Sequence, residues 1–443
     1  MKIQISDHFN YRKLIQFTIP TIAMMIFTSV YGVVDGIFVS NFVGSDAFAA
    51  VNLIMPVLMI LGSIGFMIGT GGSALVSKTL GEGKEQKAKE IFSMLIAVVI
   101  VTGLVLALIG IVLIRPIARW LGADESLLEY CVVYGRILLI GNVPFMLQNT
   151  FQSFLVVAER PQMGLKISVA AGLTNMVLDF VFVYVMRWGV AGAGMATVTS
   201  QLVGSVIPLV YFIKKDSRPL RFVRFEWDKN SLFKSCTNGS SEMMTNLSMS
   251  LVSMLYNFQL MKFAGADGVA AYGIIMYVSF IFVSVYIGYS IGAAPIVSYH
   301  YGAGNHKELK SLFRKSLVIV IAASVMLTGT AEILAGRLAA IFVSYDAQLF
   351  AMTTLALRLY SISFIFSGVN IFASAFFTAL NDGLISALIS FLRTLLFQVV
   401  MIFLLPAMFG LEGIWLAIVV AELMALAVSV FCFKRFGKKY HYI

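Results

Sequence analysis

The chain has 443 residues, of which 59% are hydrophobic and only 12% are charged, and its formal net charge is +10. This composition excludes an ordinary soluble domain, because uncharged stretches such as 47–77 and 91–114 exceed the ~20 residues with which a helix crosses a bilayer. Since these stretches are long and lack alternating polarity, they also exclude a membrane β-barrel. The sequence therefore predicts an all-α polytopic membrane protein.

The first apolar run follows Arg12 and Lys13 and contains Pro20 and Asp35. Because the run has no small-residue cleavage site, we interpret it as a retained first helix rather than a signal peptide. Asp35 is the only charged residue in this run. A buried ionised aspartate costs about 2.5–3.5 kcal/mol near the centre of a membrane helix, so its presence indicates a specific role.

The apolar runs divide the chain into twelve predicted membrane-spanning helices. Their approximate ranges are 14–39, 47–79, 91–114, 128–157, 162–186, 189–213, 235–262, 268–301, 315–336, 350–380, 383–407 and 411–433. Basic residues gather in alternate loops and in the tail, so the positive-inside rule places both termini on the cytoplasmic side of the membrane. This topology accounts for the net charge, and we expect no nucleic-acid partner.

One sequence pattern occurs twice along the chain. The segment 44–57 aligns without a gap with 265–278, and half of the paired positions are identical. The shift in numbering is 265 − 44 = 221 residues and is called the repeat offset below. The same shift relates Gly81 to Gly302. Each half has an even number of spans, so the halves enter the membrane in the same direction as parallel repeats. The expected domains are an N-terminal lobe at 1–213, a cytoplasmic connector at 214–234 and a C-terminal lobe with a basic tail at 235–443.

A few polar residues lie inside the predicted spans of the first lobe at a similar depth. Asn175 and Asp179 are four residues apart, which places them on one face of the fifth helix. Asp35, Tyr134 and Thr197 match the depth of Asp179, since all lie roughly 6–12 Å from the external ends of their helices. Such side chains would line one polar cavity, whose oxygen atoms suit a proton or a Na⁺ ion.

The carboxyl groups in this cavity favour cation coupling, although a second interpretation stays open. Two neighbouring buried carboxyl groups do not both ionise cheaply, so one of them can load and release a proton. Alternatively, Asp35 and Asp179 form hydrogen bonds between helices and only fix their packing. The same two interpretations apply to Asn175, Thr197 and Tyr134.

The whole chain resembles the multidrug and toxic compound extrusion (MATE) family, in the branch of MepA-type bacterial multidrug exporters. The resemblance rests on three matching helices, with Tyr-Gly-Val-Val-Asp-Gly at 31–36 after Pro20, Asn175-x-x-x-Asp179, and Thr197. It implies a cation site in the N-terminal lobe, formed by Asp35, Asn175, Asp179 and Thr197. It also implies a hinge at Pro20, multidrug efflux and a part in antibiotic resistance.

The second lobe lacks the acidic pair of the first. Tyr256 and Val400 stand where the repeat offset would place the counterparts of Asp35 and Asp179. Some relatives carry coupling carboxylates on the seventh and tenth helices instead. Here the seventh helix has Glu242, whereas the tenth has no acidic residue. We expect Glu242 to take part either in coupling or in substrate contact, and this second type of site is at best half present.

Arg393 and Glu422 are charged residues deep inside the last two helices. Each lies roughly 15–16 Å into its span, and the two helices run antiparallel, so the side chains reach the same level. The depth of both residues predicts an ion pair within the membrane. Its expected role is structural, because pairing neutralises two charges that are costly to bury alone.

The function predicted from these features is secondary antiport by alternating access, in which lipophilic cationic drugs leave in exchange for H⁺ or Na⁺. Methionine and aromatic side chains repack around varied apolar molecules, which suits a promiscuous site. Candidates for the cavity wall lie on helices expected to face the cleft: Phe38, Gln148, Phe151, Gln152 and Met276. We expect a protein that functions as a monomer in the bilayer, with no cofactor besides the coupling ion.

Two other functions stay open. A flippase for lipid-linked saccharides belongs to the same broad superfamily, but such proteins commonly carry cationic residues where this first lobe has carboxylates. A membrane-embedded enzyme is disfavoured, because the spans lack clustered histidines or a His/Cys/Asp set. The chain also lacks the nucleotide-binding pattern G-x-x-x-x-G-K-[ST]. The sequence thus predicts a transporter that is neither an enzyme nor driven directly by ATP.

Overall fold

The computed structural model describes residues 3–214, 219–344 and 346–443, apart from the side chains of residues 35–37, 39–41, 45 and 48. All regular elements of this described part are helical. The first lobe contains α1 (Tyr11–Phe42), α2 (Ser45–Gly81), α3 (Glu85–Trp120), α4 (Glu125–Ile140), α5 (Asn142–Val157), α6 (Pro161–Asp179), η1 (Phe180–Val185) and α7 (Gly189–Ile213). The second lobe contains α8 (Lys229–Gly302), α9 (His306–Val343), α10 (Ala347–Ser361), α11 (Phe364–Ala379), α12 (Gly383–Phe391), η2 (Leu392–Leu396) and α13 (Phe397–Phe436).

Two of the longest helices are hairpins. A straight helix of 74 residues, the length of α8, would measure about 110 Å, far more than a bilayer is thick. The backbone leaves helical geometry at Gly265 in α8 (φ 61°, ψ −149°) and at Gly410 in α13 (φ 59°, ψ −136°). At these points the chain turns back, which glycine permits because it has no Cβ.

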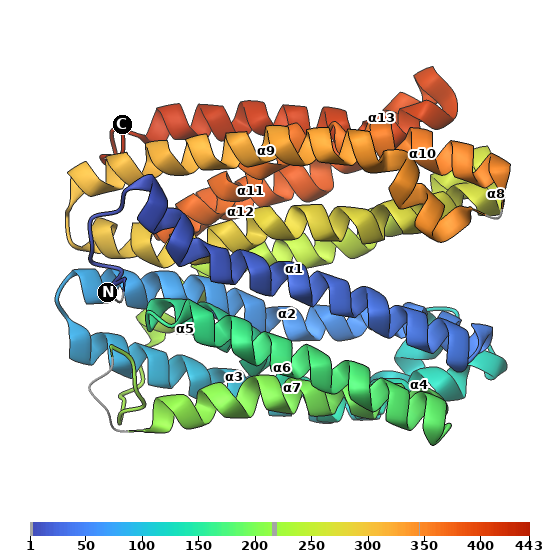
Figure 1. The fold of residues 1–443 in the computed structure, drawn as a ribbon. Coiled ribbons are helices and arrows are strands. Elements are labelled where there is room, and N and C mark those ends of the chain that lie inside the picture. Colours follow the sequence, from blue (N-terminus) through green and yellow to red (C-terminus); the bar gives the residue numbers. More distant parts are fainter. Residues whose placement is uncertain (1–2, 215–218, 345) are drawn as a thin grey trace.

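Two further pairs of helices form single, bent spans. The axes of α4 and α5 meet at 53°, and those of α10 and α11 meet at 47°. Counting each bent pair once and each hairpin twice, the described residues contain twelve membrane-crossing segments, six in each lobe. The predicted fold class is confirmed, and Figure 1 shows the two lobes side by side with both termini at the same end.

The backbone repeats the symmetry that the sequence predicts. Three pairs of glycines, each related by the repeat offset, have positive φ angles in both lobes, namely Gly44 with Gly265, Gly83 with Gly304, and Gly189 with Gly410. Residues with a side chain rarely adopt this conformation. In both lobes, glycines with positive φ therefore form the turns at equivalent positions.

Each lobe has its own apolar core. In the first lobe the ring of Phe92 contacts those of Phe154 and Phe212, with centroids 4.9 and 4.8 Å apart. In the second lobe Phe313 contacts Phe376 at 5.0 Å. Aromatic pairs at such distances stabilise a core beyond the burial of their surface. The cluster around Phe92 also includes Ile296 of α8 and Leu312 of α9, so the two cores are joined where the lobes meet.

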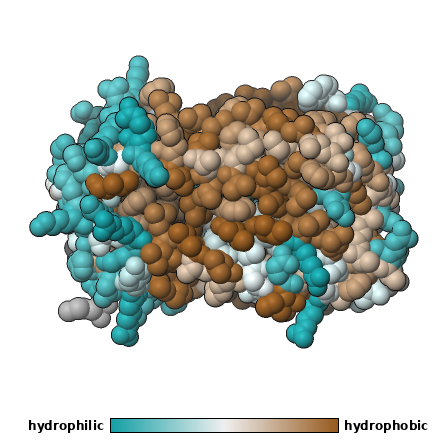
Figure 2. All heavy atoms as spheres, turned by 90° about the horizontal axis from the view of Figure 1, so that it is seen from above, coloured by the Kyte–Doolittle hydropathy of each residue, from teal (hydrophilic) through white to brown (hydrophobic). Residues whose placement is uncertain are grey.

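A broad apolar band crosses the middle of one face of the molecule (Figure 2). Figure 2 shows hydrophobic residues across the middle of one face and hydrophilic residues at the two ends, most densely at the end that carries the termini. Leu108 and Val112 of α3 are 67% and 74% exposed, as expected for side chains that face lipid. The hydrophilic end, with the loops 82–84 and 303–305 and the tail 434–443, is called the basic end below.

The two lobes meet closely and symmetrically at the basic end. A Cβ atom on Gly81 of α2 would lie 2.1 Å from the carbonyl oxygen of Tyr299 in α8. Reciprocally, a Cβ atom on Gly302 would lie 2.1 Å from the carbonyl oxygen of Lys78. The repeat offset relates Gly81 to Gly302 and Lys78 to Tyr299, so this contact lies on the pseudo-twofold axis.

A second close approach allows a direct test of the packing between lobes. A Cβ atom on Gly239 of α8 would lie 1.8 Å from the carbonyl oxygen of Met67 in α2, whereas one on Gly273 would meet nothing within 4 Å. We expect Gly239→Ala to destabilise the protein by about 1–3 kcal/mol, since backbone atoms must move apart. Gly273→Ala, the matched control, should be neutral or slightly stabilising. Thermal unfolding midpoints in detergent would show this, and equal midpoints for the two variants would contradict it.

The N-terminal segment (residues 3–10) ties α1 to the second lobe. Phe9 is fully buried, and its backbone N–H donates to Glu308 Oε1 at 2.8 Å. His8 Nδ1 lies 2.6 Å from the other carboxylate oxygen of Glu308, and Lys315 Nζ donates to the carbonyl oxygen of Phe9. The start of α1 is therefore held by side chains of α9.

Asp228 caps the N-terminus of α8. Its carboxylate accepts hydrogen bonds from the backbone N–H and the hydroxyl of Ser231 at 3.0 and 2.8 Å, and Lys87 Nζ of α3 lies 2.9 Å away. The Lys87 ammonium, followed by the Ser231 donors, holds the pKa of Asp228 well below its usual range. The cap thus joins the second lobe to a helix of the first.

The low pKa of Asp228 makes its contribution to stability depend on pH. Because the folded pKa is below the unfolded one, the contribution is complete above about pH 4 and disappears as the pH falls through the folded pKa. We expect Asp228→Ala to lower the free energy of unfolding by about 1 kcal/mol at pH 7. Unfolding midpoints of both proteins should converge as the pH falls from neutral into the acid range. A difference that stays constant with pH would exclude this role.

Candidate cation site in the N-terminal lobe

Asn175 and Asp179 lie at the end of α6, where the helix changes its geometry. The two residues are 2% and 0% exposed. Directly after Asp179 the chain continues as the π-helical turn η1. Such turns within helical spans are frequent at functional sites. The structure therefore places a carboxyl group and a carboxamide together inside the first lobe, at an irregular point of a span.

The face of α6 that carries these residues also contacts α1. Gly172, Asn175 and Asp179 have the spacing of one helix face. A Cβ atom on Gly172 would lie 3.0 Å from Cδ1 of Tyr31 in α1. Asp35 follows Tyr31 by four residues in the same helix, and the side chain of Asp35 lies outside the described residues. The two helices that carry the predicted acidic residues are thus direct neighbours.

Tyr134 and Thr197 lie on the other helices of the predicted site. Tyr134 of α4 is 1% exposed, and a Cβ atom on Gly194 of α7 would lie 3.5 Å from its ring. Thr197 is half-buried on α7, and its hydroxyl donates to the carbonyl oxygen of Ala193 at 3.1 Å. The hydroxyl oxygen keeps its capacity to accept. The contacts of α1 with α6, α6 with α7 and α7 with α4 bring the four helices together.

The carboxamide of Asn175 lies one helical turn before Asp179, and both residues are buried. Its oxygen is buried, and no donor in the described part of the chain reaches it. An unsatisfied buried acceptor costs about 1–3 kcal/mol, and other buried oxygens of the described residues, such as the amide oxygen of Gln201, are in the same state. An oxygen acceptor one turn from a buried carboxyl group fits a proton carrier or a Na⁺ ion.

Arg393 and Glu422 lie together in the second lobe. Nε of Arg393 in η2 donates to both carboxylate oxygens of Glu422 in α13, at 2.8 and 3.0 Å. The Glu422 carboxylate also accepts from Nδ2 of Asn370 at 2.7 Å, and Ser429 donates to the oxygen of that carboxamide at 2.9 Å. Asn370 and Ser429 were missed by sequence reasoning, because uncharged polar residues in a span give no distinct signal.

Glu242 lies in the same part of the second lobe. It is half-buried on α8, and Asn246 donates to its backbone carbonyl oxygen at 2.9 Å. Arg393 is close enough to interact electrostatically with Glu242, although the guanidinium is already bonded to Glu422. Glu242 therefore lies in the second lobe, on a helix that contacts η2, the turn that carries Arg393.

Two of the five candidates for the cavity wall are core residues. Phe151 is fully buried and stacks on Phe212 with centroids 5.6 Å apart. Gln148 is 8% exposed, and a Cβ atom on Gly204 of α7 would lie 2.6 Å from its carboxamide carbon. Both side chains thus point into the first lobe, because α5 packs this face against α7. The remaining candidates are half-buried: Phe38, Gln152 and Met276.

Pro20 is buried where α1 crosses α8. Its neighbours Thr18 and Thr21 pack closely against Gly292 of α8. A Cβ atom added to Gly292 would lie 3.0 Å from the side chain of Thr18 and 2.5 Å from that of Thr21. Proline lacks the backbone N–H that would bond the preceding turn, so the helix is weaker here. The expected hinge residue therefore sits at a contact between the lobes, within a helix that is continuous in this structure.

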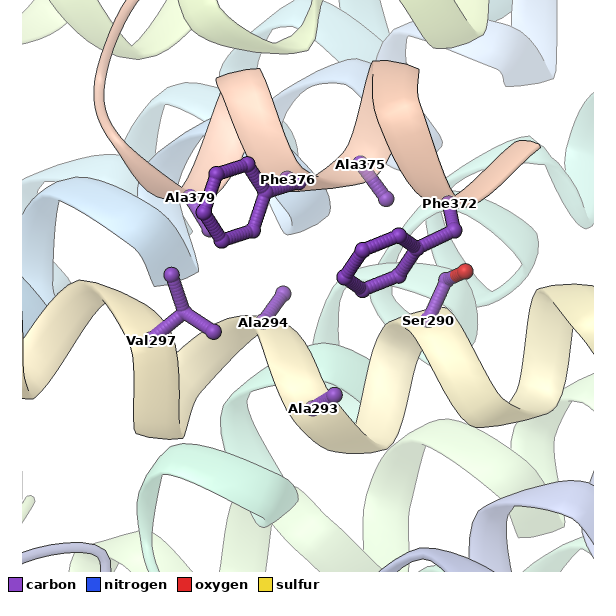
Figure 3. Close-up of a pocket in the computed structure, with 8 residues that line it drawn as sticks. All are labelled: Ser290, Ala293, Ala294, Val297, Phe372, Ala375, Phe376 and Ala379. Atoms are coloured by element: carbon purple, nitrogen blue, oxygen red, sulfur yellow. The ribbon is translucent and has the colours of Figure 1, made fainter. Parts of the chain in front are cut away.

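A small void between α8 and α11 is not a ligand site. Figure 3 shows the rings of Phe372 and Phe376 facing small residues of α8. The void has no room for a water-sized molecule. Its lining residues are Ser290, Ala293, Ala294, Val297, Phe372, Ala375, Phe376 and Ala379. It is a packing gap inside the second lobe.

Comparisons with known proteins agree with this architecture. The multidrug export protein MepA of Staphylococcus saprophyticus is 23% identical to the chain, over 95% of this chain and 93% of its own length. MepA of Staphylococcus aureus is 22% identical, with shares of 95% and 93%. A crystal structure of MATE in complex with MaL6 shares the fold with a TM-score of 0.93, at 22% identity and 98% coverage of both chains. The MatE family model matches residues 20–181 and again residues 243–404. Since these two matches span most of both lobes, the chain belongs to the MatE family.

Proposed function

We propose that this protein is a secondary active exporter of lipophilic, cationic compounds, which it exchanges for H⁺ or Na⁺ by alternating access. The observation that carries the proposal is the buried pair Asn175 and Asp179, with its unsatisfied carboxamide oxygen, on the face of α6 that contacts α1. The similarity to the MepA multidrug export proteins supports export as the direction of transport.

In this proposal the coupling ion binds in the N-terminal lobe. Asp179 supplies a carboxylate and Asn175 a neutral oxygen, with Asp35, Thr197 and Tyr134 as further ligands or hydrogen-bond partners. A proton neutralises a carboxylate, and Na⁺ does the same by coordination. Either ion drives export only by binding the outward-facing and inward-facing states with different affinities.

The contacts between the lobes support alternating access. The close approaches of α2 to α8 involve residues 67–81 and residues 235–239 and 299–302, toward the basic end. If this end faces the cytoplasm, as the positive-inside rule indicates, these contacts close the cytoplasmic side. Substrate entry from that side then requires the same contacts to separate as the two lobes move relative to each other.

The substrate class follows from the residues that are available. An aromatic and methionine-rich wall accommodates varied apolar shapes, and a carboxylate with aromatic neighbours favours a positive charge. Phe38, Gln152 and Met276 remain the proposed contacts. Each lobe is complete within one chain, which fits a functional monomer in the bacterial cell membrane.

Proteoliposomes test this proposal directly. The full chain is reconstituted, and the movement of a fluorescent lipophilic cation is followed under a pH gradient or a Na⁺ gradient, each imposed separately. Transport driven by one gradient supports antiport and identifies the coupling ion. If folded protein moves the cation under neither gradient, the proposal is wrong, and movement of an anionic lipid-linked saccharide would then favour a flippase.

A further inference from the structure

A pocket of about 260 Å³ opens at the basic end between α2, α3 and the first turns of α8. Unlike the void between α8 and α11, it has room for a small polar group. Its lining is dominated by charged side chains, namely Lys78, Lys84, Lys87 and Lys234 with Glu82 and Asp228. Helices of both lobes contribute, so any occupant of this pocket touches both.

The acidic residues of the pocket already have partners. Glu82 lies 2.8 Å from Nζ of Lys84, and Asp228 lies 2.9 Å from Nζ of Lys87. No carboxylate in the described part of the chain forms an ion pair with Lys234. Four lysines against two acids leave the pocket with two excess positive charges, so it favours an anion.

The pseudo-twofold axis provides an internal comparison, because the repeat offset places a second copy of this site in the chain. In that copy Phe9 stands in place of Asn230, and Glu308 stands in place of Lys87. There, Phe9 is fully buried, and its backbone N–H donates to the Glu308 carboxylate. In this second copy the ring of Phe9 therefore occupies the space, and the carboxylate of Glu308 supplies the negative charge.

The two copies differ in bulk and in charge. Asn230 lines the open pocket at the position where Phe9 fills its counterpart, so space is left over. The open pocket has Lys87 where the second copy has Glu308, and Lys78 where the second copy has Tyr299. The open pocket is therefore positively charged. In the second copy, Phe9 fills the space and Glu308 supplies a negative charge. A molecule that binds in the open pocket must therefore fill space and carry negative charge.

We propose that this pocket binds the phosphate headgroup of an anionic phospholipid. The flanking residues Trp227 and Phe233 are 58% and 71% exposed, and aromatic side chains of this kind anchor proteins at the membrane interface. Lysine-lined pockets at the ends of membrane helices bind anionic headgroups. A headgroup held by Lys84 on one lobe and Lys234 on the other stabilises the closed arrangement of the basic end.

The test counts lipids on the purified full chain by native mass spectrometry in detergent, with phosphatidylglycerol titrated against phosphatidylcholine. The double variant Lys84→Gln/Lys234→Gln removes two pocket charges. Lys229→Gln/Lys307→Gln removes two charges from exposed lysines outside the pocket lining. We expect phosphatidylglycerol to bind roughly tenfold more weakly or worse to the pocket variant, and with wild-type affinity to the control. Equal weakening in both variants would overturn the proposal.

A third variant separates a built site from diffuse attraction. Asn230→Phe keeps every lysine and fills the pocket as Phe9 fills its counterpart. It should lose phosphatidylglycerol while keeping the thermal unfolding midpoint of the lipid-free wild type. Undiminished binding to a folded Asn230→Phe protein would overturn the proposal. Inorganic phosphate that competes as strongly as phosphatidylglycerol would also overturn it, because the site would then serve a soluble anion.

Discussion

Replacing Asp179 by asparagine should leave a folded protein in the membrane and lower gradient-driven export by at least about 100-fold. Asparagine has nearly the same shape, but it binds no proton and carries no negative charge to attract Na⁺, so the coupling ion no longer binds there with useful affinity. An ion without differential affinity for the two conformations cannot shift their equilibrium. Asp35→Asn should have the same effect, since both carboxyl groups belong to the proposed site.

The efflux of a fluorescent lipophilic cation from proteoliposomes measures this effect. Asp267→Asn is the matched control, because Asp267 is an exposed acid near the hairpin turn of α8, outside the proposed site. It should transport like the wild type. Unfolding midpoints establish that each variant is folded. If Asp35→Asn and Asp179→Asn both transported at the wild-type rate, the cation site would lie elsewhere.

Removing either partner of the Arg393–Glu422 pair should destabilise the second lobe strongly. Glu422→Leu leaves the guanidinium of Arg393, which is only 15% exposed, without its carboxylate. Arg393→Met leaves the buried carboxylate without its cation. An unpaired buried charge costs about 3–5 kcal/mol, whereas replacing both partners by apolar residues is often neutral. The double variant Arg393→Met/Glu422→Leu should therefore recover most of the lost stability.

A double-mutant cycle based on the free energy of unfolding in detergent measures this coupling. Asn370 retains an acceptor in the double variant, because it also donates to the backbone carbonyl oxygen of residue 422 at 2.9 Å. If the double variant were destabilised by the sum of the two single effects, the charges would not be coupled. The ion pair would then make no net contribution to the lobe.

The features that sequence reasoning predicted are those with a simple physical signature. Long uncharged runs identify helical spans because the bilayer has a fixed thickness. The internal repeat identifies the two lobes, and equivalent glycines such as Gly44 and Gly265 mark their turns. Arg393 and Glu422 were paired from depth alone, because a buried charge needs a counter-charge at its own level.

Other features depend on packing that hydropathy does not encode. The span predicted at 128–157 is broken at Gly141, where a Cβ atom would lie 2.5 Å from Val198 of α7. This close contact between Gly141 and α7 cannot be predicted without knowing how the helices of the lobe pack. Phe151 was assigned to the cavity wall and is a core residue, because core, cleft and lipid-facing positions of a membrane protein are all apolar. Asn370 was missed because a single amide barely changes the hydropathy of its span.

The anchoring of the N-terminal segment has a mechanical consequence for the first helix. The backbone of Phe9 forms hydrogen bonds with Glu308 and Lys315 of the second lobe. The N-terminal end of α1 is therefore held in place by the second lobe. The weak point at Pro20 lies close to that fixed end, and Asp35 lies far beyond it. A small change of angle at Pro20 would therefore displace Asp35 much more than the residues next to the proline.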